Sequence, residues 1–377
     1  MRLRLCSILL IISALMFVCG CGGSGSESGS GNAPAGSAPA GSVTERQGVT
    51  KEQTAAVPAE ASIGVIYSSE AGSSVIQWVN DAMEPVGTTD LSYSDLGRNI
   101  GFQNACYQGA DAVMVSQGES EKDNSVLLLS SDGTLKTIRQ DRINPVSWSV
   151  SDGSIAVASN FNWECFIDLI DLQSGAIRSV RVPDDAFADT ICIGERSVYG
   201  ISEDLDDESG RHALTEYSME DGSAKKLLDL PPEDSPAFLQ YHSGKLYLIS
   251  GGGLLVYDTA DGSTDTYSLT RDDAFNLMIS DDALWIGYTD IHADDARSLI
   301  ECRDPETGEV RCSAEVEDVI LQIGPDGQNV CVLGENMLYR FTRSGDALTG
   351  TGRMECSDSD NYTGGFFLLD RGGTEDE

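Results

Sequence analysis

Residues Lys245–Leu269 read KLYLISGGGLLVYDTADGSTDTYSL, and this stretch decides the fold class. Two aliphatic and aromatic runs flank a glycine triplet, and an Asp-Gly pair precedes a third run. Runs of this length and composition, separated by turn residues, are typical of short antiparallel strands. Glycine suits position 262 because a tight hairpin needs a positive φ there. The stretch therefore predicts three consecutive strands, near 245–250, 254–258 and 264–269.

The same kind of turn recurs along the chain, at Gly133, Gly175, Gly222, Gly262, Gly308 and Gly345. By subtraction, these glycines lie 42, 47, 40, 46 and 37 residues apart. From residue 61 onward short apolar runs alternate with turns, and no long run keeps a helical period. A strand repeat of this length indicates a propeller blade. The sequence therefore predicts an all-β protein, a seven-bladed β-propeller of four-stranded antiparallel blades over residues 61–371.

The first blade has only three strands of its own, near 63–68, 75–80 and 86–91. The chain ends with a spare apolar strand, Gly365–Asp370. Pairing of this strand with the first blade would close the ring and leave no radial gap with open strand edges. We expect that closure. Six or eight blades are the alternative counts, and a pair of two-sheet sandwiches is the alternative fold.

Two strand–turn–strand stretches, LVYDTADG at 255–262 and IECRDPETGEV at 300–310, resemble repeats of bacterial extracytoplasmic propellers. Those repeats include WD-like, YVTN-type and quinoprotein-like families, and the resemblance covers about residues 62–370. It implies the propeller fold and an exported protein. The chain has no Trp-Asp dipeptide, and no residue matches a quinone site, so the resemblance implies no cofactor.

The first 21 residues contain Arg2 and Arg4, an apolar run over 5–18 and then Cys-Gly-Cys. Two cations before a short apolar core are typical of a secretory signal, and the core is shorter than the roughly 20 residues that span a bilayer. Val18-Cys19-Gly20-Cys21 resembles the lipobox of bacterial lipoproteins. The resemblance implies a signal peptide over 1–20, cleavage before Cys21 and lipidation of that cysteine with a palmitate-type anchor. An ordinary signal peptide and an uncleaved anchor are the alternatives.

Residues 21–60 follow the leader and are mostly Gly, Ser, Ala, Pro, Thr and Val. Such a segment lacks the large apolar side chains that a folded core needs. We therefore expect the lipidated cysteine and a disordered tether over 21–60, and an acidic tail over 372–377. The expected location is the extracytoplasmic side of a cell membrane.

The formal net charge is −37. The leader contains two of the 24 cations and no acid, so 22 cations and 61 acids remain after its removal. This negative field repels phosphate backbones and anionic headgroups, so we expect no nucleic-acid partner. The acidity has two interpretations, solubility and recognition of a cationic partner.

Carboxylates gather in the loops that join strands b to c and strands d to a, which share one face of a propeller. Among them are Asp184-Asp185 and Asp272-Asp273. The candidate partner or cation face comprises Asp204, Asp206, Asp207, Glu208, Asp290, Asp294 and Asp295. Oxygen-rich loops suit Ca²⁺, but 204–210 lacks the full spacing of a calcium loop. We therefore predict no cofactor, with Ca²⁺ as the candidate metal.

The chain contains no Gly-x-Ser-x-Gly elbow, and its three histidines fall in separate loops. We therefore predict no catalytic residue and favour a binding or scaffold module whose partner is a protein, peptide or glycan. The alternatives are a propeller enzyme, either a carboxylate-based hydrolase or lyase or a quinone-dependent dehydrogenase, and a sensor or assembly subunit.

Seven cysteines follow Cys21, an odd number. Cys302 and Cys312 flank the turn at 304–309 on neighbouring predicted strands. A turn of three or five residues would place them directly opposite each other, whereas a turn of four would place them on opposite faces. They are the candidate disulfide.

Overall fold

The computed structural model describes residues 41–369 except for 70–71, 98–106, 109–110, 118–123, 141, 143, 152, 162–163, 184–185, 205–210, 232–236, 281, 291–296 and 357–360. Strands are the only regular elements in this part of the chain. It contains no helix that is long and apolar enough to cross a bilayer. The signal peptide, Cys21, tether residues 21–40 and the acidic tail lie outside the described residues.

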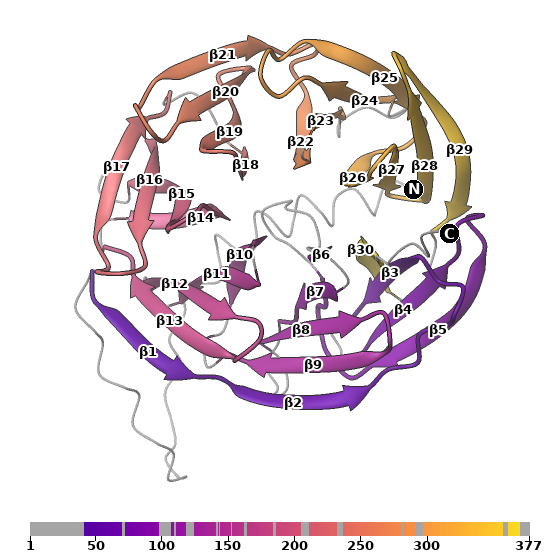
Figure 1. Ribbon diagram of the computed structural model, residues 1–377, viewed down its shortest axis with the longest axis horizontal. Coiled ribbons are helices and arrows are strands. Elements are labelled where there is room, and N and C mark those ends of the chain that lie inside the picture. Colours follow the sequence, from indigo (N-terminus) through magenta and orange to yellow (C-terminus); the bar gives the residue numbers. More distant parts are fainter. Residues whose placement is uncertain are drawn as a thin grey trace, which may run out of the picture. The chain divides into compact units, whose positions relative to one another are not determined.

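Seven antiparallel sheets form a ring, and each supplies one blade (Figure 1). The strands of each blade are given from the inner one outward. Blade one consists of β30 (Tyr362–Leu368), β3 (Ile63–Ser68), β4 (Ser74–Val79) and β5 (Pro85–Leu91), and blade two of β6 (Tyr107–Gln108), β7 (Asp111–Val115), β8 (Ser125–Ser130) and β9 (Thr134–Arg139). Blade three consists of β10 (Pro145–Ser151), β11 (Ser154–Phe161), β12 (Glu164–Asp171) and β13 (Ala176–Arg181). Blades four and five consist of β14 (Ala186–Ile193), β15 (Ser197–Asp204), β16 (His212–Ser218) and β17 (Ala224–Asp229); and β18 (Ala237–His242), β19 (Lys245–Ser250), β20 (Gly253–Asp258) and β21 (Thr264–Ser268). Blades six and seven consist of β22 (Ala274–Ser280), β23 (Ala283–Tyr288), β24 (Ser298–Arg303) and β25 (Val310–Val316); and β26 (Ile320–Asp326), β27 (Asn329–Gly334), β28 (Met337–Ser344) and β29 (Ala347–Glu355). The predicted seven-bladed, four-stranded propeller is confirmed.

The core is divided into seven apolar layers, one between each pair of neighbouring blades. Strand β8 shows how a blade supplies two of them: Val126 and Leu128 pack toward blade three, while Leu127 and Leu129 pack toward blade one. Consecutive side chains of a strand point to opposite faces, so a blade that is covered on both faces needs a continuous apolar run. This requirement explains the short unbroken apolar runs of the sequence.

The turns that join strands c and d explain the repeated glycines. All six have a positive φ, between 60° at Gly345 and 87° at Gly133. In five of these turns an aspartate oxygen accepts a backbone N–H two or three residues further on, for example Asp261 from Ser263 at 2.8 Å. This local hydrogen bond is the usual role of aspartate in a turn, so these acids are structural.

The C-terminal strand closes the ring. Strand β30 pairs with β3, with Leu368 opposite Ile63, and begins three residues earlier than predicted. The Gln322 side chain of blade seven donates to the Phe366 carbonyl oxygen at 2.7 Å and accepts from the Phe366 N–H at 2.8 Å. Phe367 packs edge-on against Trp78, with ring centroids 5.7 Å apart. The predicted closure is therefore confirmed.

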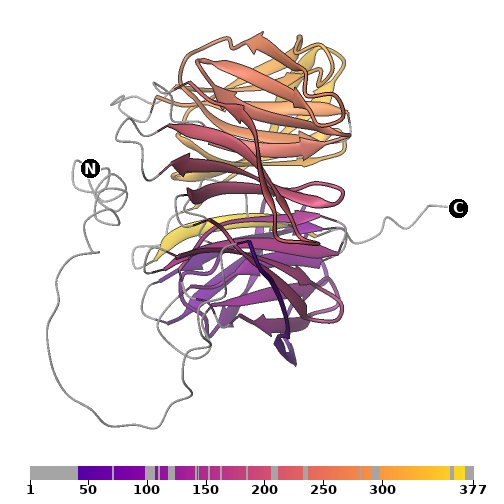
Figure 2. The same ribbon diagram turned by 90° about the vertical axis from the view of Figure 1, so that its left-hand side faces the viewer.

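The expected tether is wrong for part of its length, because β1 (Val43–Gln47) and β2 (Val49–Thr54) are strands. Strand β1 pairs with the outer strand of blade three, and β2 pairs with the outer strand of blade two. Together they form a strap along the rim of the ring (Figures 1 and 2). The segment needs no large apolar side chains, because the blade edges supply backbone hydrogen-bond partners and leave its side chains largely in solvent.

Candidate functional site

A polar hollow of about 630 Å³ lies on the predicted face, between blades five and six. Its lining comes from three connections, namely Gly252 in the b–c turn of blade five, residues 269–273 between the blades, and Asp290 after strand b of blade six. Gly251 and Gly252 both have positive φ values, which lets two glycines turn the chain at this edge of the hollow.

The charged groups of the hollow have unequal surroundings. Arg271 is held by both carboxylate oxygens of Asp273, with Nε to Oδ1 at 2.8 Å, and donates from Nη1 to the Arg297 carbonyl oxygen at 2.9 Å. Asp272 is exposed, and nothing among the described residues pairs with its carboxylate. Asp290 is also exposed. Because Asp273 neutralises Arg271, the hollow presents a net negative charge.

A buried ion pair supports the loop that lines the hollow. Arg303 and Glu301 are each only 2% exposed, and Nη2 of Arg303 donates to Oε2 of Glu301 at 2.8 Å. The same nitrogen also donates to the Thr270 hydroxyl at 3.0 Å. Tyr288 donates its hydroxyl to Glu301 at 2.8 Å. Buried charges are tolerated when they are paired and hydrogen-bonded in this way.

The protonation state of Tyr288 follows from this environment. Burial, followed by the hydrogen bond to the Glu301 carboxylate, raises the pKa of Tyr288 to about 12. The hydroxyl is therefore neutral at pH 7 and remains a donor. Glu301, Arg303 and Tyr288 thus fix the backbone near Thr270 before any ligand arrives.

The sequence prediction named seven acids for this face. The structure describes Asp290 in full and Asp204 by its backbone alone. Asp290 lines the hollow, beside Asp272 and Asp273, which the sequence also placed on this face. Asp204 is the last residue of β15. The other five, Asp206, Asp207, Glu208, Asp294 and Asp295, lie outside the described residues.

The described residues contain no group of three or more His, Cys, Asp or Glu side chains that could hold a metal ion. Three described carboxylates are buried, those of Asp168, Glu301 and Asp318. Each is already bound within the fold. Asp168 and Glu301 pair with arginines, and Asp318 accepts the N–H groups of Asn336 at 2.7 Å and Met337 at 3.0 Å.

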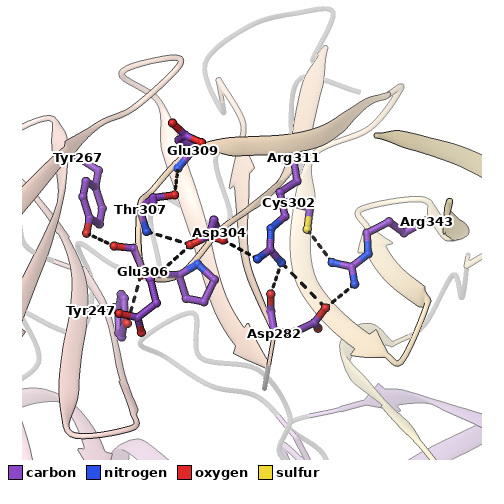
Figure 3. Close-up of polar contacts among 11 residues, drawn as sticks. Tyr247, Tyr267, Asp282, Cys302, Asp304, Glu306, Thr307, Glu309, Arg311 and Arg343 are labelled. Atoms are coloured by element: carbon purple, nitrogen blue, oxygen red, sulfur yellow. Dashed lines mark hydrogen bonds and ion pairs between the residues drawn. The ribbon is translucent and has the colours of Figure 1, made fainter. Parts of the chain in front are cut away.

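Acids on the opposite face of blade six make structural contacts (Figure 3). Asp304 accepts two backbone N–H groups at 2.9 Å and an Arg311 guanidinium at 2.6 Å. The Arg311 hydrogen bond, followed by the backbone N–H of Thr307, lowers the pKa of Asp304 to about 2. Asp282 pairs with Arg343 at 2.5 Å. The two faces therefore differ: Asp282 and Asp304 make ion pairs within the fold, whereas Asp272 has no ion-pair partner among the residues that the structure describes.

Cys302 and Cys312 lie directly opposite each other in the β24–β25 register, because a β-bulge between the Arg303–Val310 pair and the Cys302–Cys312 pair shifts the pairing by one residue. Both are buried free thiols. Nη1 of Arg343 lies 3.3 Å from Sγ of Cys302 (Figure 3). The predicted geometry is present, and the disulfide itself stays a prediction.

Comparison with known proteins shows the fold. No protein-family model matches the chain, and no curated protein matches it significantly. A Bacteroides uniformis protein solved as a candidate 6-phosphogluconolactonase superposes with a TM-score of 0.55 at 11% identity, over 82% of this chain and 100% of its own. The tricorn protease superposes with a TM-score of 0.53 at 12% identity, over 91% of this chain and 37% of its own. At these identities the likeness establishes the β-propeller alone.

Sequence reasoning missed Thr270 and the Arg303–Glu301 pair as parts of this site. A signal for the pair was available in the sequence, because residues two apart on a strand share a face. No spacing in the sequence connects them to Thr270, which belongs to a different blade.

Proposed function

We propose that this protein is a lipid-anchored extracytoplasmic binding module whose propeller recognises a cationic protein or peptide through the hollow between blades five and six. The observation that carries the proposal is the exposed Asp272, whose carboxylate pairs with none of the described residues and which lines the hollow together with Asp290. The loop of Asp272 is held in place by buried Arg303, which donates to Thr270. A site of this kind favours a positive group, because the local arginine is already neutralised by Asp273. Fixed charges that need no rearrangement also lower the cost of binding.

The binding test uses a fluorescent deca-lysine peptide and the double variant Asp272→Asn with Asp290→Asn. We expect the variant to bind about three- to tenfold more weakly, since each partly exposed ion pair contributes a few tenths to one kcal/mol. The matched control is Asp326→Asn with Asp346→Asn, which makes the same charge change on exposed acids of the opposite face. Equal weakening in both variants would mean that net charge alone attracts the peptide. Replacing Asp204, Asp206, Asp207 and Glu208 by Asn or Gln extends the test to the neighbouring loop.

Calcium is tested separately. If Ca²⁺ binds the acidic loops of the native state, it should raise the melting temperature in a concentration-dependent way. The deca-lysine peptide should then compete with it. A melting temperature that Ca²⁺ does not change would remove the metal from the proposal and leave the peptide.

The anchor is supported by the leader, with Arg2, Arg4 and the Val18–Cys21 sequence. Metabolic labelling with an alkyne fatty acid should mark the wild-type protein, and Cys21→Ala should abolish the label. Retention of the label in the variant would place the lipid elsewhere. Loss of the label with unchanged membrane retention would indicate an uncleaved apolar anchor.

A further inference from the structure

The outer strands of blades two and three carry an unusual balance of charge for this acidic chain. Strands β1, β2, β9 and β13 together contain six cations and two carboxylates, namely Arg46, Lys51, Lys136, Arg139, Arg178 and Arg181 against Glu45 and Glu52. The outer strands of the other five blades contain four cations and five carboxylates, namely Lys225, Lys226, Arg311 and Arg353 against Asp90, Asp229, Asp265, Glu315 and Glu355. We call the first group of four strands the strap rim.

Two of the cations on the strap rim are available to a partner. Arg178 pairs with Glu45 at 2.8 Å, and Arg181 pairs with Glu164 at 3.2 Å. Lys51 and Arg139 are exposed, and no carboxylate among the described residues forms an ion pair with either. Glu52 stands opposite Lys136 in the register, so the positive charge left without a counterion on the strap rim, among the described residues, is that of Lys51 on β2 and Arg139 at the end of β9.

An exposed apolar side chain lies between these two cations. Val49 is 59% exposed, and Val310 at 46% is the other exposed large apolar side chain among the described residues. Val49 stands directly opposite Arg139 in the register, and Lys51 follows two residues later on the same side of the strand. An apolar residue flanked by cations suits the boundary between headgroups and acyl chains, where each part finds a matching environment.

The chain also enters the fold at the strap rim. Gly41, the first described residue, donates its N–H to the Arg181 carbonyl oxygen at 3.1 Å. Positions 22–40 separate it from Cys21, and even a fully extended chain of this length spans at most about 70 Å. An anchor on Cys21 would therefore keep this edge of the ring within that distance of the bilayer and raise its effective concentration there.

We infer that the strap rim is the membrane-facing surface of the propeller and binds an anionic lipid surface. The inference rests on the proposed lipid anchor. Repulsion from the acidic remainder of the molecule does not prevent it, because charges are screened over about 8 Å at physiological salt. Lys51 and Arg139 lie within that distance of the headgroups when the rim touches the surface, whereas the acids of distant blades do not. The ring then stands on its edge, and the hollow between blades five and six is free to meet a partner.

The test uses the full lipidated chain in vesicles, either of phosphatidylcholine alone or of phosphatidylcholine and phosphatidylglycerol in equal amounts. Lysines are acylated with a water-soluble reagent and quantified by mass spectrometry. We expect acylation of Lys51 to slow several-fold on the anionic vesicles, while Lys225, exposed on β17, reacts at the same rate on both. Two further variants are compared by hydrogen exchange over residues 43–54. Lys51→Arg keeps the positive charge and should retain the contact with the vesicle, whereas Val49→Asp should reduce it.

Charge reversal gives an independent measurement. Lys51→Glu with Arg139→Glu should abolish the difference in exchange over 43–54 between the two vesicle types. The control Lys225→Glu with Arg353→Glu makes the same charge change on blades four and seven and should retain that difference. Melting curves of the two double variants establish that both are folded.

The outcomes separate the two proposals. Flotation of the protein with vesicles after a high-salt wash tests the anchor alone. Flotation without protection of Lys51 would overturn the membrane-facing rim and leave the anchor standing. Failure to float would overturn the anchor, and the rim with it. Protection of Lys51 that appears without vesicles and rises with protein concentration would overturn the lipid proposal in favour of a second copy of the chain.

Discussion

Asp168 is the residue on which the strap depends. Its carboxylate is wholly buried and receives Nη2 of Arg46 at 2.7 Å and Nε of Arg142 at 3.2 Å. The Ser179 hydroxyl also donates to it. Arg46 comes from β1, so this one carboxylate connects the N-terminal segment to strand β12 of blade three. Arg142 additionally stacks over the Phe166 ring, 3.5 Å from its centroid.

We expect Asp168→Asn to lower the free energy of unfolding by about 2–4 kcal/mol, because it leaves two guanidiniums without their buried counterion. Arg46→Met should cost less, about 1 kcal/mol, because Arg142 and Ser179 still satisfy Asp168 and the Arg46 side chain is a quarter exposed. Urea unfolding of the two variants measures both values. A larger loss for Arg46→Met than for Asp168→Asn would show that the strap, and not the carboxylate, is the main source of stability.

Oxidation of Cys302 and Cys312 is the second residue-scale prediction. Burial, followed by the neighbouring Cys302, raises the pKa of Cys312 to about 11, so its thiol stays protonated at pH 7. Since the thiolate is the reactive form, the disulfide should form while the chain folds and not afterwards. Glutathione disulfide would be reduced to two glutathiones as the two thiols lose two electrons and two protons.

Refolding with glutathione disulfide should therefore give a Cys302–Cys312 bond that non-reducing peptide mapping detects. Closing a loop of about ten residues stabilises by roughly 2–3 kcal/mol, which should raise the melting temperature by several degrees. Cys312→Ser should show no difference between oxidised and reduced refolding. Two alkylatable thiols after oxidative refolding would contradict the prediction.

The residue scale also shows what sequence reasoning could reach. Positive φ at the turn glycines was predictable, because a tight hairpin turn requires it locally. The opposition of Cys302 and Cys312 was one of two geometries that the sequence left open, and the β-bulge beside Cys302 decides between them. The Arg46–Asp168 pair was not predictable, because 122 residues separate its members and nothing local indicates the contact.

At the scale of elements, strand β30 bears most directly on the stability of the ring. It supplies Phe366 to the layer between blades seven and one, and Phe367 to the layer between blades one and two. Deleting residues 362–377 should cost several kcal/mol of a stability that is typically only 5–15 kcal/mol, since it removes both layers' aromatic contacts and leaves the edge of β3 unpaired. We expect aggregation or a much lower melting temperature.

The matched control deletes only residues 371–377, which lie beyond the strand. This shorter deletion should leave the melting temperature unchanged. Circular dichroism and light scattering of the two truncated chains decide the matter. A cooperative melt of the longer deletion at the wild-type temperature would show that blade one does not need its inner strand.

The strap illustrates an element that composition conceals. Its strands, VTERQ and VTKEQT, contain one valine each and no other large apolar residue, so an argument from burial predicts disorder. Their stability comes from backbone pairing with β13 and β9, which composition does not report. The available signal was β-propensity: valine followed by threonine begins each run, and Gly48 separates them.

At the scale of the whole molecule, the ring was predictable because every blade repeats one physical requirement. Each buries both faces against its neighbours, so strands and turn glycines recur at intervals of 37 to 47 residues. The hollow was not predictable, because Gly252, Arg271 and Asp290 come from three separate connections of two blades. The repeat specifies the fold, whereas a site on one face of the ring depends on the sequences of the individual loops.

Net charge gives the molecule a characteristic dependence on pH. The charge is −37 at pH 7 and vanishes near the pI of about 4.1. Self-repulsion of like charges opposes compactness, so acidification from pH 7 toward 5 should stabilise the fold. The turn aspartates act in the other direction at lower pH. Hydrogen bonds within the turns lower the pKa of Asp132, Asp171 and Asp261, and the pKa values of Asp221 and Asp304 fall to about 2.

A carboxyl group whose pKa is lower in the folded state than in the unfolded state stabilises the fold above the unfolded value of about 3.8. That contribution is lost as pH falls through the folded pKa, because both states are then protonated. The melting temperature should therefore rise from pH 7 to about pH 5 and fall steeply between about pH 4 and pH 2. Added salt should raise it at pH 7, where repulsion is strong, and much less at pH 5. Scanning calorimetry across this range, with and without salt, measures both effects. A melting temperature that declines steadily from pH 7 to pH 4 would mean that attractive interactions of the ionised carboxylates outweigh repulsion throughout, and that the acidity of this propeller costs its fold little.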